Sequence, residues 1–129
     1  MAEPPRIVIL DDDDAICAML TATLDGSYEC VVGKTGREGL KICGSNRVDL
    51  VLTDIGMPEL DGIQMLEEFQ KDPCLAAIPV LVLTATHFSQ RSRSQVSCFP
   101  QVRGILLKPC SVEEITGAIA RVLKERLAS

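Results

Sequence analysis

Three acidic residues stand where apolar segments end, and together they could carry chemistry. Asp54 directly follows the apolar segment 48–53, and Asp11 and Asp12 directly follow the apolar segment 6–10. If both segments are strands of one parallel sheet, their carboxyl ends share an edge and the three carboxylates lie close together. Carboxylates that crowd in this way raise one another's proton affinity unless a cation neutralises them. The oxygen ligands favour Mg²⁺ as that cation.

Two further polar residues are predicted at the same edge. Thr84 ends the apolar segment 80–84, and Lys108 follows the apolar segment 104–107. A carboxylate at Asp54 could attack phosphorus as a nucleophile, while the Lys108 ammonium and a metal ion stabilise charge on the transferring oxygens. The Thr84 hydroxyl would hydrogen-bond one phosphoryl oxygen. These residue types predict a site that handles phosphoryl groups.

Five short segments rich in valine, isoleucine and leucine predict the strands that position these residues. The predicted strands are residues 6–10, 29–32, 48–53, 80–84 and 104–107. Segments with helical spacing of apolar residues alternate with them, which predicts right-handed crossovers and helices on both faces of a parallel sheet. Asp13 or Asp14 is expected to cap the first helix, and Ser111 with Glu114 to form a capping box on the last. The serine-rich segment 88–98 gives the weakest helix. The fold class is a doubly wound α/β domain.

The composition indicates one domain and excludes several functions. The chain has 129 residues, 47% of them hydrophobic, with a formal net charge of -5 and a pI near 4.8. We predict a single domain over residues 1–129, with residues 1–5 as a flexible lead. No dense block of basic residues favours direct binding to nucleic acid or anionic lipid. Neither a signal peptide nor an apolar stretch of ~18 residues is evident, which predicts a cytoplasmic protein without a membrane span. Six cysteines without a CxxC pair are expected to be reduced and mostly buried.

Four motifs in register resemble the receiver domain of two-component response regulators, over roughly residues 6–127. The motifs are Ile9-Leu10-Asp11-Asp12, Asp54-Ile55-Gly56-Met57-Pro58-Glu59-Leu60-Asp61-Gly62, Leu83-Thr84-Ala85 and Leu107-Lys108-Pro109. The resemblance implies a five-stranded, flavodoxin-like sheet of order 2-1-3-4-5. It also implies a cis peptide bond between Lys108 and Pro109. The implied partners are a histidine kinase or phosphotransfer protein that donates the phosphoryl group, and a downstream protein whose binding is switched.

The resemblance also assigns roles to individual residues. It implies that Asp54 is the phosphoacceptor, that Asp12 and Asp54 bind Mg²⁺ directly, and that Asp11 assists through water. The backbone carbonyl of Gly56 is a further implied ligand. The implied activity is Mg²⁺-dependent self-phosphorylation followed by slow loss of phosphate, because neither Gly56 nor Thr86 can orient a hydrolytic water. Turnover as an enzyme is not expected.

The chain departs from the family pattern near its last strand. Ile105 occupies a position that is often aromatic in the family, Cys110 replaces a common aromatic after Lys-Pro, and residues 99–103 replace the usual Gly-Ala segment. The signalling face formed by the fourth helix, last strand and last helix is therefore expected to be unusual. A phosphorylation-dependent homodimer is one outcome that the resemblance allows.

The same sequence allows other interpretations. An aspartyl-nucleophile phosphatase of the haloacid dehalogenase type commonly needs an acid two residues after the nucleophile, where this chain has Gly56. A degenerate binding module that works without phosphate is a third alternative. The segment 33–35 ends like a phosphate-binding loop but lacks the earlier glycine, which predicts a plain turn. His87, the only histidine, is expected at the rim of the site without a chemical task.

Overall fold

Five parallel strands form the middle layer of the protein. The computed structural model describes residues 3–57, 60–85 and 90–128. The strands are β1 (Arg6–Leu10), β2 (Glu29–Gly33), β3 (Leu50–Thr53), β4 (Val80–Ala85) and β5 (Val102–Lys108). They pair in the order β2-β1-β3-β4-β5, and every pair is parallel. The predicted strand order is confirmed.

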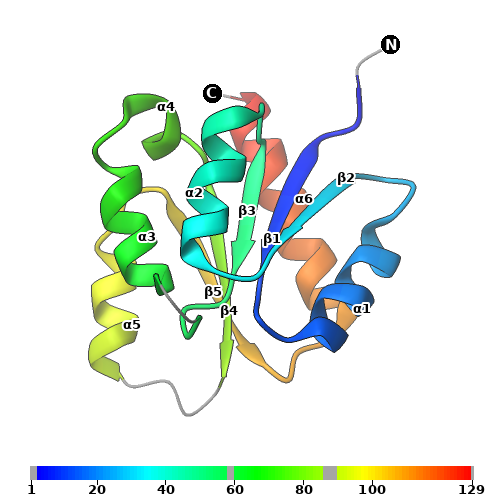
Figure 1. Cartoon of the computed structure of the whole chain (residues 1–129). Helices are drawn as coiled ribbons and strands as arrows, with labels where there is room; N and C mark the ends of the chain where they lie inside the picture. The colour runs from blue at the N-terminus through cyan, green and yellow to red at the C-terminus, as the bar shows by residue number, and fades with distance from the viewer. Residues whose placement is uncertain (1–2, 58–59, 86–89, 129) are drawn as a thin grey trace.

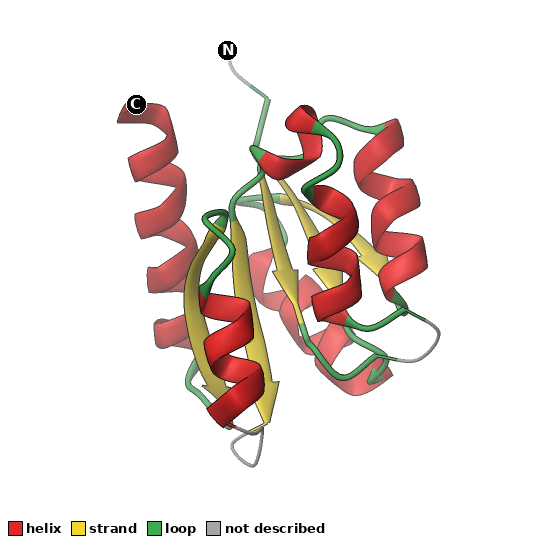
Figure 2. Cartoon of the chain, turned by 90° about the vertical axis from the view of Figure 1, so that its left-hand side faces the viewer, coloured by secondary structure: helices red, strands yellow, loops and turns green. Residues whose placement is uncertain are grey.

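Helices cover both faces of this sheet, so the domain has three layers (Figures 1 and 2). The helices are α1 (Asp14–Leu24), α2 (Gly36–Ser45), α3 (Gly62–Phe69), α4 (Pro73–Ala76), α5 (Gln90–Ser97) and α6 (Val112–Ala128). Figure 1 shows α1 and α6 on one side of the sheet and α2, α3 and α5 on the other. None of the helices in the described ranges is long and apolar enough to cross a membrane.

The core is divided between the two faces of the sheet. In β1, Ile7 and Ile9 pack with residues of α1 and α6, whereas Val8 and Leu10 pack with residues of α2 and α3. All four of these side chains are fully buried. Burial on both faces explains why the strands are continuously apolar rather than alternating.

Two predicted helix ends are confirmed by their caps. The Asp13 carboxylate caps α1 and accepts backbone hydrogen bonds from Ala15 at 2.9 Å and Ile16 at 3.3 Å. Ser111 and Glu114 form the expected capping box, in which the Glu114 amide donates to the Ser111 hydroxyl at 3.1 Å. These caps satisfy amides that have no partner inside the helix.

The structure differs from the sequence prediction in the extent of several elements. β5 covers residues 102–108 rather than 104–107, and β3 begins at Leu50 rather than at residue 48. The Asp49 carboxylate, just before β3, accepts a hydrogen bond from the backbone amide of Arg6 at 2.8 Å. The helix predicted over residues 88–98 is α5, which begins at Gln90. The short helix α4 was not predicted, and it breaks the strict alternation because α3 and α4 both lie between β3 and β4.

The prediction that the cysteines are mostly buried is wrong. All six are free, as expected, but only Cys17 and Cys43 are buried, while Cys74 and Cys98 are exposed. Cys74 lies on the unpredicted helix α4 and Cys98 follows the last residue of α5, so their exposure depends on elements whose boundaries the sequence does not define well.

A buried glutamine holds the start of β5 against the connection before β4. Gln101 is 4% exposed, and its side-chain amide donates to the carbonyls of Leu75 at 3.1 Å and Ile78 at 2.8 Å. Its side-chain oxygen accepts a hydrogen bond from the Gln70 amide. Gln101 therefore joins the start of β5 to residues 70–78, which lie 23 to 31 positions earlier in the sequence.

We expect Gln101→Ala to lower the free energy of unfolding by about 1–3 kcal/mol, because two buried carbonyls lose their donor. Urea unfolding monitored by circular dichroism measures this change. Gln95→Ala, at an exposed position of α5, is the matched control and should change the free energy by no more than about 0.5 kcal/mol. Equal effects of the two substitutions would contradict the prediction.

Candidate functional site

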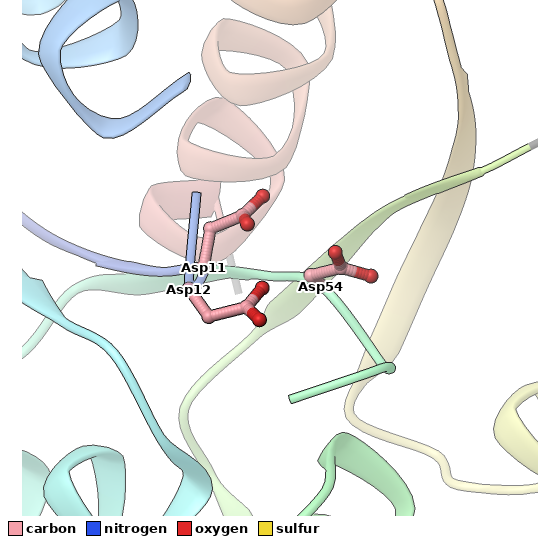
Figure 3. A group of neighbouring side chains, drawn as sticks. All are labelled: Asp11, Asp12 and Asp54. Atoms are coloured by element: carbon pink, nitrogen blue, oxygen red, sulfur yellow. The ribbon is translucent and has the colours of Figure 1, made fainter. Parts of the chain in front are cut away.

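The three predicted carboxylates meet at the carboxyl ends of β1 and β3. Leu10 and Thr53 are paired in the sheet, and the Asp54 amide donates to the Leu10 carbonyl at 2.8 Å. One carboxylate oxygen from each of Asp11, Asp12 and Asp54 lies within 4.8 Å of the others (Figure 3). Asp11 is buried, Asp54 is partly buried and Asp12 is exposed. The cluster is open to solvent on one side and closed on the other.

Lys108 brings a positive charge to this cluster from the end of β5. Its Nζ lies 2.8 Å from Oδ2 of Asp11 and 3.1 Å from Oδ2 of Asp54. These partners are 97 and 54 residues away in sequence. The strand order places β5 two positions from β3, and the long lysine side chain spans the remaining distance.

The electrostatics of the cluster follow from burial and from this ion pair. Burial raises the pKa of Asp11 and outweighs its hydrogen bonds from Lys108 and from the Asp13 amide. Burial lowers the pKa of Lys108, but its hydrogen bonds to Asp11 and Asp54 outweigh this, so the pKa lies above the ordinary lysine value. Lys108 is therefore charged at neutral pH. One ammonium against three carboxylates leaves an excess of negative charge that a divalent cation can neutralise.

Backbone amides orient the Asp54 side chain. Its Oδ1 accepts hydrogen bonds from the Ile55 amide at 2.7 Å and the Gly56 amide at 3.3 Å, while Oδ2 contacts Lys108. Asp11 is oriented in a similar way, because its Oδ1 accepts from the Asp13 amide at 3.0 Å. Both carboxylates are thus held in place before any ligand binds.

Gly62 is a positioning residue that the sequence analysis did not recognise as part of the site. Its amide donates to the Ile55 carbonyl at 2.9 Å, and a Cβ added at this position would lie 2.9 Å from Ile55 Cα and 3.0 Å from the Asp54 carbonyl oxygen. Only glycine permits this approach of the two backbones. The sequence signal for this role is the position of Gly62 directly after Asp61, which caps the start of α3.

The remaining predicted site residues lie at the same edge or outside the described ranges. Thr84 is 2% exposed near the end of β4 and pairs with Leu107, one residue before Lys108. Gly56 is exposed beside Asp54. Thr86 and His87 fall outside the described residues. The structure therefore brings Asp11, Asp12, Asp54 and Lys108 into one cluster and places Thr84 on the adjoining strand.

The residues after Lys108 are also informative. The peptide bond between Lys108 and Pro109 is cis, as the resemblance implied. Burial raises the pKa of the Cys110 thiol, Glu114 adds to this, and Lys108 opposes it only in part. The thiol is therefore not activated by the neighbouring lysine. The segment 33–35 is a turn in which Thr35 caps α2, as predicted.

An apolar groove adjoins Lys108 on the side of the sheet that α1 and α6 cover. It has a volume of about 430 Å³. Its lining residues are Ile16, Met19, Leu83, Lys108, Pro109, Cys110 and Ile115. Met19 is 44% exposed, which is unusual for a large apolar side chain in this protein.

Fold and site together define a flavodoxin-like α/β domain with an acidic, lysine-bridged cluster at its strand ends. The family model for the response regulator receiver domain matches residues 7–120, and the chain belongs to this family. It is therefore a phosphoacceptor signalling domain of the kind found in two-component systems. Aspartyl phosphatases and phosphate-independent modules are not favoured by these matches.

Similar proteins carry this domain in different contexts. The chain is 32% identical to the response regulator MprA of Mycolicibacterium vanbaalenii, over 94% of this chain and 51% of that protein. It is 25% identical to the sensor histidine kinase TmoS of Ectopseudomonas mendocina, over 98% of this chain and 13% of that protein. The structure of the chemotaxis response regulator CheY4 of Vibrio cholerae matches with a TM-score of 0.83 and 26% identity, over 93% of this chain and 99% of that one. The chain spans about half or less of the curated relatives it matches.

Proposed function

We propose that Asp54 is the phosphoacceptor and that it takes a phosphoryl group from a phosphohistidine of a histidine kinase or phosphotransfer protein. The observation that carries this proposal is the position of Lys108 Nζ, which lies against Asp54 Oδ2 while backbone amides hold Oδ1. An Asp54 oxygen attacks phosphorus, the bond from phosphorus to the histidine nitrogen breaks, and the imidazole leaves with that electron pair. Lys108 balances negative charge on the transferring oxygens, and Thr84 donates its hydroxyl to one of them.

The donor set fits Mg²⁺ in chemistry and spacing. Three carboxylate oxygens within 4.8 Å of one another can surround one small divalent ion that prefers oxygen ligands, either directly or through a bound water. Asp12 and Asp54 would bind Mg²⁺ directly, Asp11 through water, with the Gly56 carbonyl as a further ligand. When bound, the ion supplies positive charge at the transferring phosphoryl oxygens.

Transfer from acetyl phosphate tests this function without a partner. With Mg²⁺ present, intact-protein mass spectrometry should show the addition of one phosphoryl group, and chelation of Mg²⁺ should prevent it. Slow loss of phosphate is also expected, because Gly56 offers no side chain to orient water. No addition of phosphate, or rapid multiple turnover of a phosphomonoester, would contradict the proposal. The second outcome would favour a phosphatase.

We expect a single domain over residues 1–129 in the cytoplasm, where a kinase or phosphotransfer protein supplies the phosphoryl group and a downstream protein recognises the result. Alternatively, phosphorylation drives two copies of the chain to form a homodimer.

The apolar groove is suited to the phosphodonor protein, because Lys108 lines it and the Lys108 Nζ lies 3.1 Å from Asp54 Oδ2. We expect Met19→Glu to slow phosphotransfer from the most active histidine kinase in a panel by about tenfold, the cost of losing one buried apolar side chain. Transfer from acetyl phosphate should not change. Ala18→Glu, at an exposed position on the same helix that does not line the groove, is the control and should leave both rates unchanged. Equal slowing with both donors would contradict docking in the groove.

A further inference from the structure

The last residue of β3 is polar, although the rest of the strand is apolar. Residues 50–52 are buried aliphatic side chains, and Thr53 is buried as completely, with 0% exposure. Because side chains alternate along a strand, Thr53 lies on the same face of the sheet as Val51, which packs in the core with residues of α2 and α3. If packing alone determined the residue at this position, a valine would fill it without a polar atom to satisfy.

The Thr53 hydroxyl has a single, local hydrogen-bond partner. In the sheet, Thr53 is paired with Leu10 of β1 and Val82 of β4, whose side chains are apolar and fully buried. A hydroxyl group that leaves water without finding a partner is costly. The Thr53 Oγ1 instead donates to the backbone carbonyl of Asp54 at 2.7 Å. The buried hydroxyl therefore acts on the backbone of the proposed phosphoacceptor.

The Asp54 carbonyl and the Ile55 amide are the two ends of one peptide unit. A peptide unit is planar, so a hydrogen bond that fixes the direction of its carbonyl also fixes the direction of its N–H. The N–H of this unit is the one that donates to Asp54 Oδ1 at 2.7 Å. The Thr53 hydroxyl thus holds one end of the unit, and the other end holds the Asp54 carboxylate.

Neighbouring peptide units are anchored by different groups. The Asp54 amide, in the unit before, donates to the Leu10 carbonyl at 2.8 Å, and the Ile55 carbonyl, in the unit after, accepts from the Gly62 amide at 2.9 Å. Among the hydrogen bonds between described residues, the Asp54 carbonyl accepts only the one from Thr53. The rotation of the middle unit therefore depends on the Thr53 hydroxyl more than on any backbone hydrogen bond to its carbonyl.

We propose that Thr53 is a positioning residue for phosphoryl transfer. It holds the peptide unit between Asp54 and Ile55 so that the Ile55 N–H keeps Oδ1 of the carboxylate in place, while Oδ2 faces Lys108 at 3.1 Å. This inference rests on the proposed function, in which Asp54 is the acceptor. Without the hydroxyl, the unit can rotate and the carboxylate can leave the orientation for attack. Small displacements of reacting atoms are costly in rate.

Two substitutions at Thr53 separate the hydroxyl from the rest of the side chain. Thr53→Val removes the hydroxyl and keeps the shape, whereas Thr53→Ser keeps the hydroxyl and leaves a small cavity. With acetyl phosphate and Mg²⁺, we expect Thr53→Val to lower the initial rate of phosphoryl incorporation by about five- to tenfold, the effect of one neutral hydrogen bond. Thr53→Ser should remain within about twofold of the wild type, because it retains that bond.

Thr21→Val is the matched control. It makes the same chemical change at a buried hydroxyl that has no hydrogen-bond partner in the described part of the chain. It should leave the rate unchanged. A wild-type rate for Thr53→Val, or equal slowing by Thr53→Val and Thr53→Ser, would overturn the proposal and leave Thr53 with a purely structural role.

Hydrogen exchange of the Ile55 amide tests the position of the peptide unit directly. Measured by NMR on unphosphorylated protein in EDTA, this exchange should be about five- to tenfold faster in Thr53→Val and unchanged in Thr53→Ser and Thr21→Val. The Val51 amide, which donates to the Pro79 carbonyl at 3.0 Å, is the internal reference for overall stability. Unchanged Ile55 exchange in Thr53→Val would overturn the positioning role. A wild type that accepts no phosphate would overturn the proposed function and leave this measurement readable.

Discussion

Asp54→Asn is expected to reduce the rate of phosphoryl incorporation by at least about 1000-fold, a barrier increase of roughly 4 kcal/mol. The amide of asparagine has nearly the shape of the carboxylate but lacks an anionic oxygen that can attack phosphorus. The initial rate of acyl phosphate formation from acetyl phosphate, measured by intact-protein mass spectrometry in the presence of Mg²⁺, gives the effect directly.

Asp13→Asn is the matched control for this change. Asp13 belongs to the same acidic tract, but it caps α1 rather than pointing at the carboxylate cluster. Asparagine caps helices about as well as aspartate, so the fold is preserved. We expect the rate to remain within about twofold of the wild type. Incorporation by Asp54→Asn at the wild-type rate would show that another residue is the acceptor.

Lys108→Met should lower the rate of phosphoryl transfer by about 100-fold, because a fixed cation no longer balances charge on the transferring oxygens. Methionine keeps much of the length and apolar area of the lysine stem, so packing changes little. Lys124→Met, at an exposed position of α6, is the control and should have no effect. A wild-type rate for Lys108→Met would remove the lysine from the proposed mechanism.

The same variant should also be less stable in the absence of metal. Asp11 is 3% exposed, and its hydrogen bond from Lys108 is charge-assisted. Losing it should lower the free energy of unfolding by about 2 kcal/mol at neutral pH in the presence of EDTA. Burial already raises the pKa of Asp11, and without Lys108 that rise is larger. In the variant, the pKa of Asp11 in the folded state lies above its pKa in the unfolded state. The loss in free energy of unfolding relative to the wild type should therefore become smaller as the pH falls, because a protonated Asp11 needs no cation. Urea unfolding at two pH values measures this.

Much of the site could be predicted because its residues stand at the ends of apolar strands. In a parallel sheet the carboxyl ends of all strands share one edge, so strand recognition alone places Asp11, Asp54, Thr84 and Lys108 together. The register of β1 against β3 then determines the distance between Asp11 and Asp54. The resemblance to receiver domains added the strand order, which explains how Lys108 reaches partners 97 and 54 residues away.

Features that depend on tertiary contacts could not be predicted in the same way. Gln101 is buried because carbonyls from the α4 region need donors, and no local pattern indicates that requirement. Helix α4 is only four residues long, too short for apolar periodicity to show. The exposure of Cys74 and Cys98 follows from such elements rather than from the residue type.

The backbone of Gly62 packs directly against the backbone of Asp54 and Ile55. Because no side chain separates the start of α3 from the backbone at Asp54 and Ile55, rotamer changes cannot absorb a displacement there. We therefore expect a shift of the Asp54 carbonyl toward α3 to displace the backbone of the first turn of that helix. The backbone at Asp54 and Ile55 is therefore mechanically coupled to the start of α3 at this point.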